Sequence, residues 1–217
     1  MQGKLIVFEG VEGCGKTTQL KRSQAWLQDS DRFAGSLHQL QTTREPGGTE
    51  FCQAIRKLLL QPASPEPIAA STELLLYAAD RAQHVAHFLQ PHLQQGAVIL
   101  CDRYTDSTIA YQGYGRGLDR SLIEQLNQIA TQGLTSDLTL WLDVDVETGL
   151  TRAKQRSGGG DRMEQATLEF HYRVQQGFRE LAANNPDRIV RIDASLDEMA
   201  VFEQIQSVLQ QYLSQWF

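Results

Sequence analysis

The sequence predicts an α/β protein, with a parallel sheet that has helices packed on both faces. Short apolar runs recur roughly every 35–50 residues, and between them lie segments whose apolar residues repeat with a helical period. Such long crossovers are typical of parallel strands, and continuous apolar strands are typical of a sheet covered on both faces. The chain has 217 residues, of which 41% are hydrophobic, enough for one sizeable core. We therefore expect a single domain over residues 1–217.

The first half of the chain is expected to contain three strands and three helices. A proline-rich stretch at 62–67 indicates a surface loop. Ser71, with Glu73 in the following turn, is close to a capping box and predicts where a long helix begins. The expected elements are a strand over 5–8, a helix over 15–27, a weaker strand over 37–43, a helix over 49–60, a helix over 71–95 and a strand over 97–101.

The second half continues the same alternation. Asp119 is expected to open a helix that ends before Gly133, because glycine commonly follows a helix C-terminus. A glycine run at 158–160 separates two further helices. The remaining expected elements are a strand over 138–142, helices over 148–156 and 164–183, a strand over 189–192 and a final helix over 197–213.

Charge and cysteine content exclude several classes of protein. The chain has 20 Lys and Arg against 26 Asp and Glu, and a net charge of −6 argues against a general nucleic-acid or acidic-membrane binder. Cys14, Cys52 and Cys101 lie far apart without a CxxC pair, which predicts a reduced, cytoplasmic chain and no zinc framework. No apolar run is long enough for a signal peptide or a membrane span.

The segment GVEGCGKT at 10–17 matches the phosphate-binding pattern GxxxxGK[ST] and lies between a predicted strand and a predicted helix. Its glycines let backbone N–H groups converge on a phosphate, and the helix N-terminus adds partial positive charge. Lys16 can reach the β- and γ-phosphates of ATP, and the Thr17 hydroxyl can ligate Mg²⁺. A glycine-rich turn without a ligand is the alternative. The candidate ATP-binding residues are Gly10, Val11, Glu12, Gly13, Cys14, Gly15, Lys16 and Thr17.

A phosphate-binding loop does not by itself choose the reaction. The sequence has no NKxD-like guanine reader and no DxxG switch, so a GTPase is disfavoured, and the chain is short for a mechanical ATPase. A kinase for a nucleotide or a deoxynucleoside remains open. So does a regulatory or assembly ATPase that hydrolyses ATP slowly without an acceptor.

Two polar segments follow strands and indicate an acceptor site, since ligands of open α/β sheets gather at the carboxyl ends of strands. Asp102 and Arg103 follow the strand over 97–101, where a carboxylate can hold magnesium through water and an arginine can clamp a phosphate. The segment REPGG at 44–48 follows the strand over 37–43, and its Glu45–Pro46 bond could be cis or trans. A strand-end salt bridge and an ordinary loop are the respective alternatives.

Tyr77 and Arg81 lie one helical turn apart on the long helix and therefore face the same way. An aromatic face with a guanidinium can bind a planar base by stacking and hydrogen bonding. The alternative is a core tyrosine beside an exposed arginine.

Together these motifs resemble thymidylate kinase (dTMP kinase) of the bacterial type, and the resemblance runs from about residue 3 to the final helix. The segments that carry it are FEGVEGCGKTTQ (8–19), TREPGGT (43–49), LLLYAADRAQH (74–84), CDRYTDSTIAYQGYGRG (101–117), SDLTLWLDV (136–144) and TRAKQRSGGGDRME (151–164). The resemblance implies a P-loop kinase three-layer sandwich with five parallel strands in the order 2-3-1-4-5. It also implies a lid at about 151–163, a homodimer, and phosphorylation of dTMP to dTDP by ATP with Mg²⁺.

The resemblance also implies a role for each matching residue. Glu12 would lie near the acceptor sugar and magnesium, Tyr77 would stack on thymine, and Tyr111 would lie under the deoxyribose. The polar edge of the base would be read by Arg81, Thr108 and Gln112; the acceptor phosphate would be surrounded by Arg44, Arg56 and Arg103, with Asp102 beside the metal; the lid would supply Arg152, Arg156 and Arg162.

The expected chemistry needs positive charge and no general base. The second pKa of a phosphomonoester is about 6, so dTMP is already a dianion at neutral pH. Gly13 and Cys14 occupy the loop region where some relatives carry a catalytic arginine, so that arginine is expected from the lid. Because no general base is needed, His84, His87 and His92 are expected on a solvated helix face and not in the site. The expected catalytic residues are Lys16, Asp102, Arg103, Arg152 and Arg156.

Overall fold

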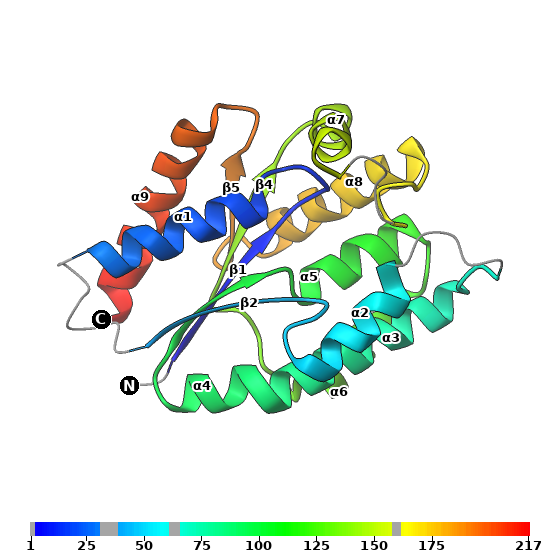
Figure 1. Ribbon diagram of the computed structural model, residues 1–217, viewed down its shortest axis with the longest axis horizontal. Helices are drawn as coiled ribbons and strands as arrows, with labels where there is room; N and C mark the ends of the chain where they lie inside the picture. Colours follow the sequence, from blue (N-terminus) through cyan, green and yellow to red (C-terminus); the bar gives the residue numbers. More distant parts are fainter. Residues whose placement is uncertain (1–2, 31–38, 61–65, 158–161) are drawn as a thin grey trace.

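The computed structural model describes residues 3–30, 39–60, 66–157 and 162–217, and its five strands form one parallel sheet (Figure 1). The strand order is β2-β3-β1-β4-β5, which confirms the expected order 2-3-1-4-5. Because all strands are parallel, their carboxyl ends lie at one edge of the sheet, where Arg44 pairs in register with Asp102. The strands are β1 (Lys4–Glu9), β2 (Leu40–Arg44), β3 (Val98–Asp102), β4 (Leu138–Asp143) and β5 (Ile189–Asp193).

The helices cover both faces of this sheet (Figure 1). Alternating strand residues define the faces: Ile6 and Phe8 of β1 pack in the core with α1, α8 and α9, whereas Leu5 and Val7 pack against η1 and α4. The helices are α1 (Lys16–Asp29), α2 (Glu50–Leu60), α3 (Ala70–His84), α4 (Gln90–Gln94), α5 (Thr105–Thr108), α6 (Arg120–Thr131), α7 (Val146–Ser157), α8 (Leu168–Asn184) and α9 (Glu198–Trp216), with π-helical turns η1 (Val85–Leu89) and η2 (Ile109–Gly115).

The long helix predicted over 71–95 is continuous but not uniform. It runs through α3, the wider turn η1 and α4, and Pro91 stands just after that turn. Proline has no amide hydrogen and crowds the carbonyl of the preceding turn, so a local change to wider hydrogen bonding accommodates it. The predicted Ser71 cap is wrong: α3 begins at Ala70 after Ala69, without a side-chain cap, so Ser71 already lies inside the first turn.

The predicted helix starting at Asp119 is confirmed, and Asp119 caps it by accepting a 2.8 Å bond from the Ser121 amide. The helix predicted from 164 begins later, at Leu168, where Thr167 is the cap. The second strand is observed from Leu40, and residues 37–38 of its predicted range lie outside the described residues. The helical segment formed by α5 and η2 was not predicted.

No helix in the described part of the chain is long and apolar enough to cross a membrane.

Candidate active site

The loop from Gly10 to Lys16 joins β1 to α1 and forms one wall of the site. Gly10 has φ 142°, and a Cβ there would lie 2.5 Å from the Leu142 carbonyl oxygen, so only glycine fits. Lys16 lies at the first position of α1, and its Nζ donates to the carbonyls of Gly10 (3.0 Å) and Val11 (2.9 Å). The ammonium group therefore lies over the loop, next to the N-terminus of α1, where phosphate would bind.

The first turn of α1 is hydrogen bonded to the end of β3. Thr17 donates from Oγ1 to Oδ2 of Asp102 over 2.7 Å. A hydroxyl oxygen and a carboxylate oxygen are both ligands that magnesium accepts. Within the described residues no cluster of three or more His, Cys, Asp or Glu could hold a metal ion. This pair is therefore suited to Mg²⁺ only when nucleotide phosphates and water supply the other ligands.

Arg103 connects the phosphate loop to the π-helical turn η2. It has a left-handed backbone, φ 74°, and its guanidinium donates to the Gly10 carbonyl (3.0 Å), to the Tyr111 hydroxyl (3.0 Å) and to the Glu12 carboxylate. Burial alone would lower the pKa of Arg103, but the Glu12 carboxylate raises it well above its ordinary value. Both side chains are therefore charged, and Arg103 is a fixed cation facing the loop.

Glu9, the last residue of β1, holds the segment that follows β3. Its buried carboxylate accepts from the amides of Tyr104 (2.8 Å) and Ser107 (3.1 Å) and from the Ser107 hydroxyl (2.6 Å). The Ser107 Oγ also accepts from Arg103 over 3.1 Å. Burial raises the pKa of Glu9 to about 7, although the nearby Arg103 charge opposes this. Glu9 thus fixes the backbone from which Arg103 projects.

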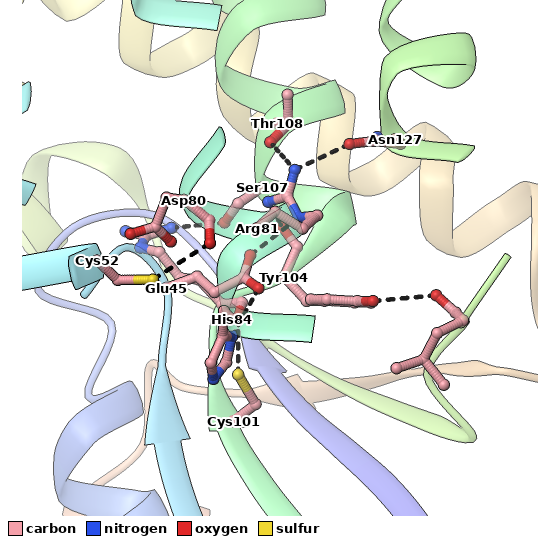
Figure 2. Close-up of polar contacts among 12 residues, drawn as sticks. Glu45, Cys52, Asp80, Arg81, His84, Cys101, Tyr104, Ser107, Thr108 and Asn127 are labelled. Carbon is pink, nitrogen blue, oxygen red and sulfur yellow. Dashed lines mark hydrogen bonds and ion pairs between the residues drawn. The ribbon is translucent and has the colours of Figure 1, made fainter. Parts of the chain in front are cut away.

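Arg81 of α3 is almost fully buried and held by a dense network (Figure 2). Its Nε donates to Glu45 (2.9 Å), and its Nη2 donates to the Tyr104 carbonyl (3.0 Å). Its Nη1 donates to Thr108 Oγ1 (2.9 Å) and to Asn127 Oδ1 (2.8 Å). A guanidinium has five N–H groups, so one N–H on Nη2 is left without a partner among the residues that the structure describes.

The expectation for the three histidines is wrong for His84. This side chain is fully buried, with Nδ1 2.8 Å from Glu45 Oε1 and Nε2 2.7 Å from Thr43 Oγ1 (Figure 2 shows the Glu45 side). The buried Glu45 carboxylate needs hydrogen-bond partners on both oxygens, and His84 and Arg81 supply them. His92 is half-buried, and only His87 is exposed as expected. The Glu45–Pro46 bond is cis.

A second buried carboxylate, Glu73 of α3, lies beside η2. It accepts from Gln112 Nε2 (2.7 Å) and from Arg116 (3.2 and 3.3 Å), and it forms a 2.6 Å ion pair with Arg162. Arg162 also donates to the Leu59 carbonyl over 2.9 Å. The end of the predicted lid segment therefore contacts α2 and α3.

One cavity of about 960 Å³, including its open mouth, brings most of the predicted site residues together. It extends from the phosphate loop to the buried network around Arg81, and Met163 and Glu164 lie at its wall. The predicted residues that line it are Glu12, Gly13, Gly15, Lys16, Thr17, Arg44, Arg56, Tyr77, Arg81, Asp102, Arg103, Thr108, Tyr111 and Gln112.

The remaining predicted residues lie elsewhere. Gly10, Val11 and Cys14 are buried within the loop itself and do not line the cavity. Arg152 of α7 donates to the Ala194 carbonyl over 3.0 Å, after β5 and away from this cavity. Arg156 lies in α7, and its side chain and the segment 158–161 are outside the described residues.

The comparisons with known proteins identify the family. The family model described as thymidylate kinase matches residues 8–205. A thymidylate kinase from Cyanothece sp. is 60% identical, with 100% of this chain and 97% of that protein covered. The chain belongs to the thymidylate kinase family. Another family member, from Nostoc sp., is 59% identical over the full length of both chains.

The fold agrees with the family as well. The crystal structure of thymidylate kinase from Ehrlichia chaffeensis superimposes with a TM-score of 0.78 at 33% identity, covering 96% of this chain and 100% of that chain. The predicted resemblance and the P-loop kinase fold are thereby confirmed. The sequence reasoning missed four residues that hold the cavity together, Glu9, Glu45, Glu73 and Asn127. Only Glu45, inside the REPGG segment, carried any local signal.

Proposed function

We propose that the cavity binds dTMP, and that the loop over 10–17 binds the ATP phosphates, so that the γ-phosphoryl group is transferred between them. The reaction follows from the family: thymidylate kinases transfer phosphate from ATP to dTMP, and this chain does the same. The observation that carries the site assignment is that one cavity joins the phosphate loop to the Arg81 network.

Positive charge at the phosphate-loop end supports binding of two polyanions. Lys16, Arg44, Arg56 and Arg103 all line the cavity, and Arg56 is directed by its 2.8 Å bond to the Pro46 carbonyl. The acceptor oxygen of dTMP is already deprotonated at neutral pH, since the second phosphate pKa is about 6. Catalysis then consists of holding donor and acceptor in line and stabilising the charge that spreads in the transition state.

The other end of the cavity supports recognition of thymine. The one N–H left on Arg81 is a donor, and Thr108 Oγ1 accepts from Arg81, so its hydroxyl hydrogen is directed elsewhere. Tyr77 supplies an aromatic ring at the cavity wall. Tyr111 lines the cavity and is anchored through its hydroxyl to Glu12 (2.8 Å), which supports the proposed position of its ring under the deoxyribose.

Magnesium is assigned to the hydrogen-bonded pair of Thr17 and Asp102. Bound Mg²⁺ would neutralise part of the negative charge of the phosphates. The protein's part is to hold the Thr17 hydroxyl and the Asp102 carboxylate together. Glu12 also lines the cavity, and its pKa is lowered: burial alone would raise this pKa, but the charges of Arg103 and Lys16 and the bond from Tyr111 lower it more.

A lid at about 151–163 and a homodimer complete the proposal. The lid supplies Arg152, Arg156 and Arg162 from α7 and the segment after it. For the dimer, α3 packs between α2 and α6, and these three helices lie together on one side of the molecule (Figure 1). They carry large exposed apolar side chains, which a second copy of the chain would cover: Phe51, Leu58, Leu75, Leu122 and Ile129. The cytoplasmic location stays a prediction.

A coupled assay for ADP formation with a panel of nucleoside monophosphates tests the proposal. We expect dTMP to be phosphorylated far faster than dCMP, dGMP or AMP, because a site with fixed polar groups rejects bases that leave those groups unpaired. Arg81→Ala should weaken the binding of dTMP much more than the binding of ATP. Equal loss for both substrates, or AMP as the better acceptor, would overturn the assignment. Slow ATP hydrolysis that no acceptor stimulates would instead favour a regulatory ATPase.

A further inference from the structure

Glu73 is hydrogen bonded to Gln112, a residue that lines the cavity. Its side chain is fully buried on α3, and Gln112 donates to it from Nε2 over 2.7 Å across to η2. Burial alone would raise the pKa of Glu73, but the bonds from Gln112 and Arg116 and the charges of Arg116 and Arg162 lower it overall. Glu73 is therefore ionised at neutral pH.

An ionised carboxylate can only accept hydrogen bonds. The amide of Gln112 must therefore turn its NH₂ toward Glu73, and its oxygen Oε1 to the opposite side. Among the described residues none donates to that oxygen, and Gln112 lines the cavity together with Arg81 and Thr108. The group that Gln112 offers to a ligand is an acceptor.

We propose that Glu73 is a positioning residue that sets base specificity, because it holds Gln112 as an acceptor facing the ring N3–H of thymine. This inference rests on the proposed function, in which the base lies against Arg81, Thr108 and Gln112. It adds a residue that does not touch the base and acts only through Gln112.

The arrangement discriminates between pyrimidines by donor and acceptor pattern. Thymine presents an acceptor at O4 and a donor at N3, which complement the remaining Arg81 N–H and the Gln112 oxygen. Cytosine presents a donor at N4 and an acceptor at N3. The Arg81 N–H would then face another donor, and the Gln112 oxygen would face another acceptor. Uracil has the same edge as thymine and lacks only the methyl group.

Glu73→Gln tests the inference with almost no change in shape. Arg116 donates to Glu73 Oε2 over 3.2 Å and Arg162 forms an ion pair with the same oxygen, so the new amide oxygen would face these two cations and its NH₂ would face Gln112. Gln112 would then flip, accept through Oε1 and present its NH₂ to the base. We expect the ratio of kcat/KM for dTMP to that for dCMP to fall at least about tenfold. The ratio for dTMP to dUMP should stay unchanged, since both have the same edge.

Two further variants distinguish a change in the orientation of the Gln112 amide from a general disturbance of the site. Arg116→Ala removes one ion-pair partner of Glu73 but leaves the Gln112 bond, so the dTMP to dCMP ratio should stay at the wild-type value. Gln112→Leu should lower that ratio, and adding Glu73→Gln to it should lower the ratio no further, because the effect runs through Gln112.

The outcomes are distinguishable. If Gln112→Leu lowers the ratio but Glu73→Gln does not, Glu73 has no positioning role and the proposed base site stands. If Gln112→Leu leaves dTMP discrimination intact, the proposed base site itself is wrong.

A measurement on the unaltered protein covers the case in which Glu73→Gln does not fold. The N3–H proton of bound, isotope-labelled dTMP should be protected from exchange while the Gln112 amide protons remain bonded to Glu73. An unprotected N3–H would overturn the inference.

Discussion

Thr17 donates its hydroxyl hydrogen to Asp102 over 2.7 Å, which joins the start of α1 to the end of β3. The two residues are far apart in sequence, and the pairing of β1 with β3 in register from Lys4↔Val98 to Phe8↔Asp102 brings them together. A cation held at this point would touch the phosphate loop and the acceptor side of the cavity at once. The sheet order thus brings together the two residues that we propose as magnesium ligands.

Asp102→Asn should therefore raise the magnesium concentration needed for half-maximal rate by at least about tenfold, because a neutral amide supports a hydrated cation less well. The measurement is the initial rate against magnesium concentration at fixed ATP and dTMP. Thr17→Ser keeps the hydroxyl oxygen and is the matched control, with a requirement close to that of the wild type. An unchanged requirement in Asp102→Asn would place the cation elsewhere.

Lys16→Ala should give a folded protein with almost no phosphoryl transfer. The ammonium group is nearly buried and lies over the loop carbonyls of Gly10 and Val11, so it is positioned for the transferred phosphate. The dTMP dissociation constant, measured by calorimetry, should change little, and kcat should fall steeply. Turnover like the wild type's in this variant would contradict the loop assignment.

Lid arginines should affect kcat and leave dTMP affinity alone. A charge-stabilising arginine is worth roughly 10³–10⁵ in kcat in related chemistry, so Arg156→Ala is expected to lower kcat at least about a hundredfold. The dTMP dissociation constant should move less than about threefold. Arg152→Ala is the parallel case, and the 3.0 Å bond from Arg152 to Ala194 ties it to the loop after β5. If both variants and the double variant keep near-normal kcat, Arg103 becomes the first candidate for this role.

The exposed apolar residues of α2, α3 and α6 should determine the oligomeric state. Ile129→Glu places a charge on the most exposed of them, 74% accessible, and should shift the protein from dimer to monomer at micromolar concentration. Light scattering coupled to gel filtration measures this. Met199→Glu, at a residue 50% exposed on α9, is the control and should leave the mass unchanged. A wild-type protein that is itself monomeric would contradict the dimer.

Local sequence signals predicted the parts of the site that depend on local chain geometry. The loop over 10–17 and the residues after β3 lie at strand ends, and strand ends are visible as breaks in apolar runs. The helix formed by α5 and η2 was missed because Tyr111 and Gln112 turn toward the cavity and glycines interrupt the apolar period. The roles of Glu73 and Asn127 depend on contacts between distant segments, which no single-sequence pattern contains.

The surroundings of the titratable residues His84 and Glu9 likewise could not be predicted from the sequence alone. Histidine at helical spacing among polar neighbours predicts a solvated face, but His84 pairs with Glu45, 39 residues away, inside the protein. Glu9 follows directly on an apolar strand, and the sequence gives no sign that the Tyr104 and Ser107 amides will surround it. Burial and partner together decide the charge of such groups, and both come from the fold.

The raised pKa of Glu9 predicts how the free energy of unfolding changes with pH. Its pKa rises from 4.5 in the unfolded chain to about 7 in the folded protein, because burial disfavours the charged carboxylate. Between these values the folded state binds more protons than the unfolded state, so the free energy of unfolding falls as pH rises from 4.5 to 7 and levels off above 7. The charged neighbours act in opposite directions: Arg103 lowers this pKa and Asp106 raises it.

Glu9→Gln removes this titration while keeping a neutral group that can still hydrogen bond the Ser107 side chain. Relative to the wild type, the variant should gain roughly 2–3 kcal/mol of unfolding free energy between pH 5 and pH 8. Asp80, whose pKa burial raises to about 6, titrates with the same sign in both proteins and cancels in the difference. Urea unfolding at several pH values from 5 to 8 gives the two curves. Parallel curves would mean that Glu9 keeps an ordinary pKa and is charged throughout this range.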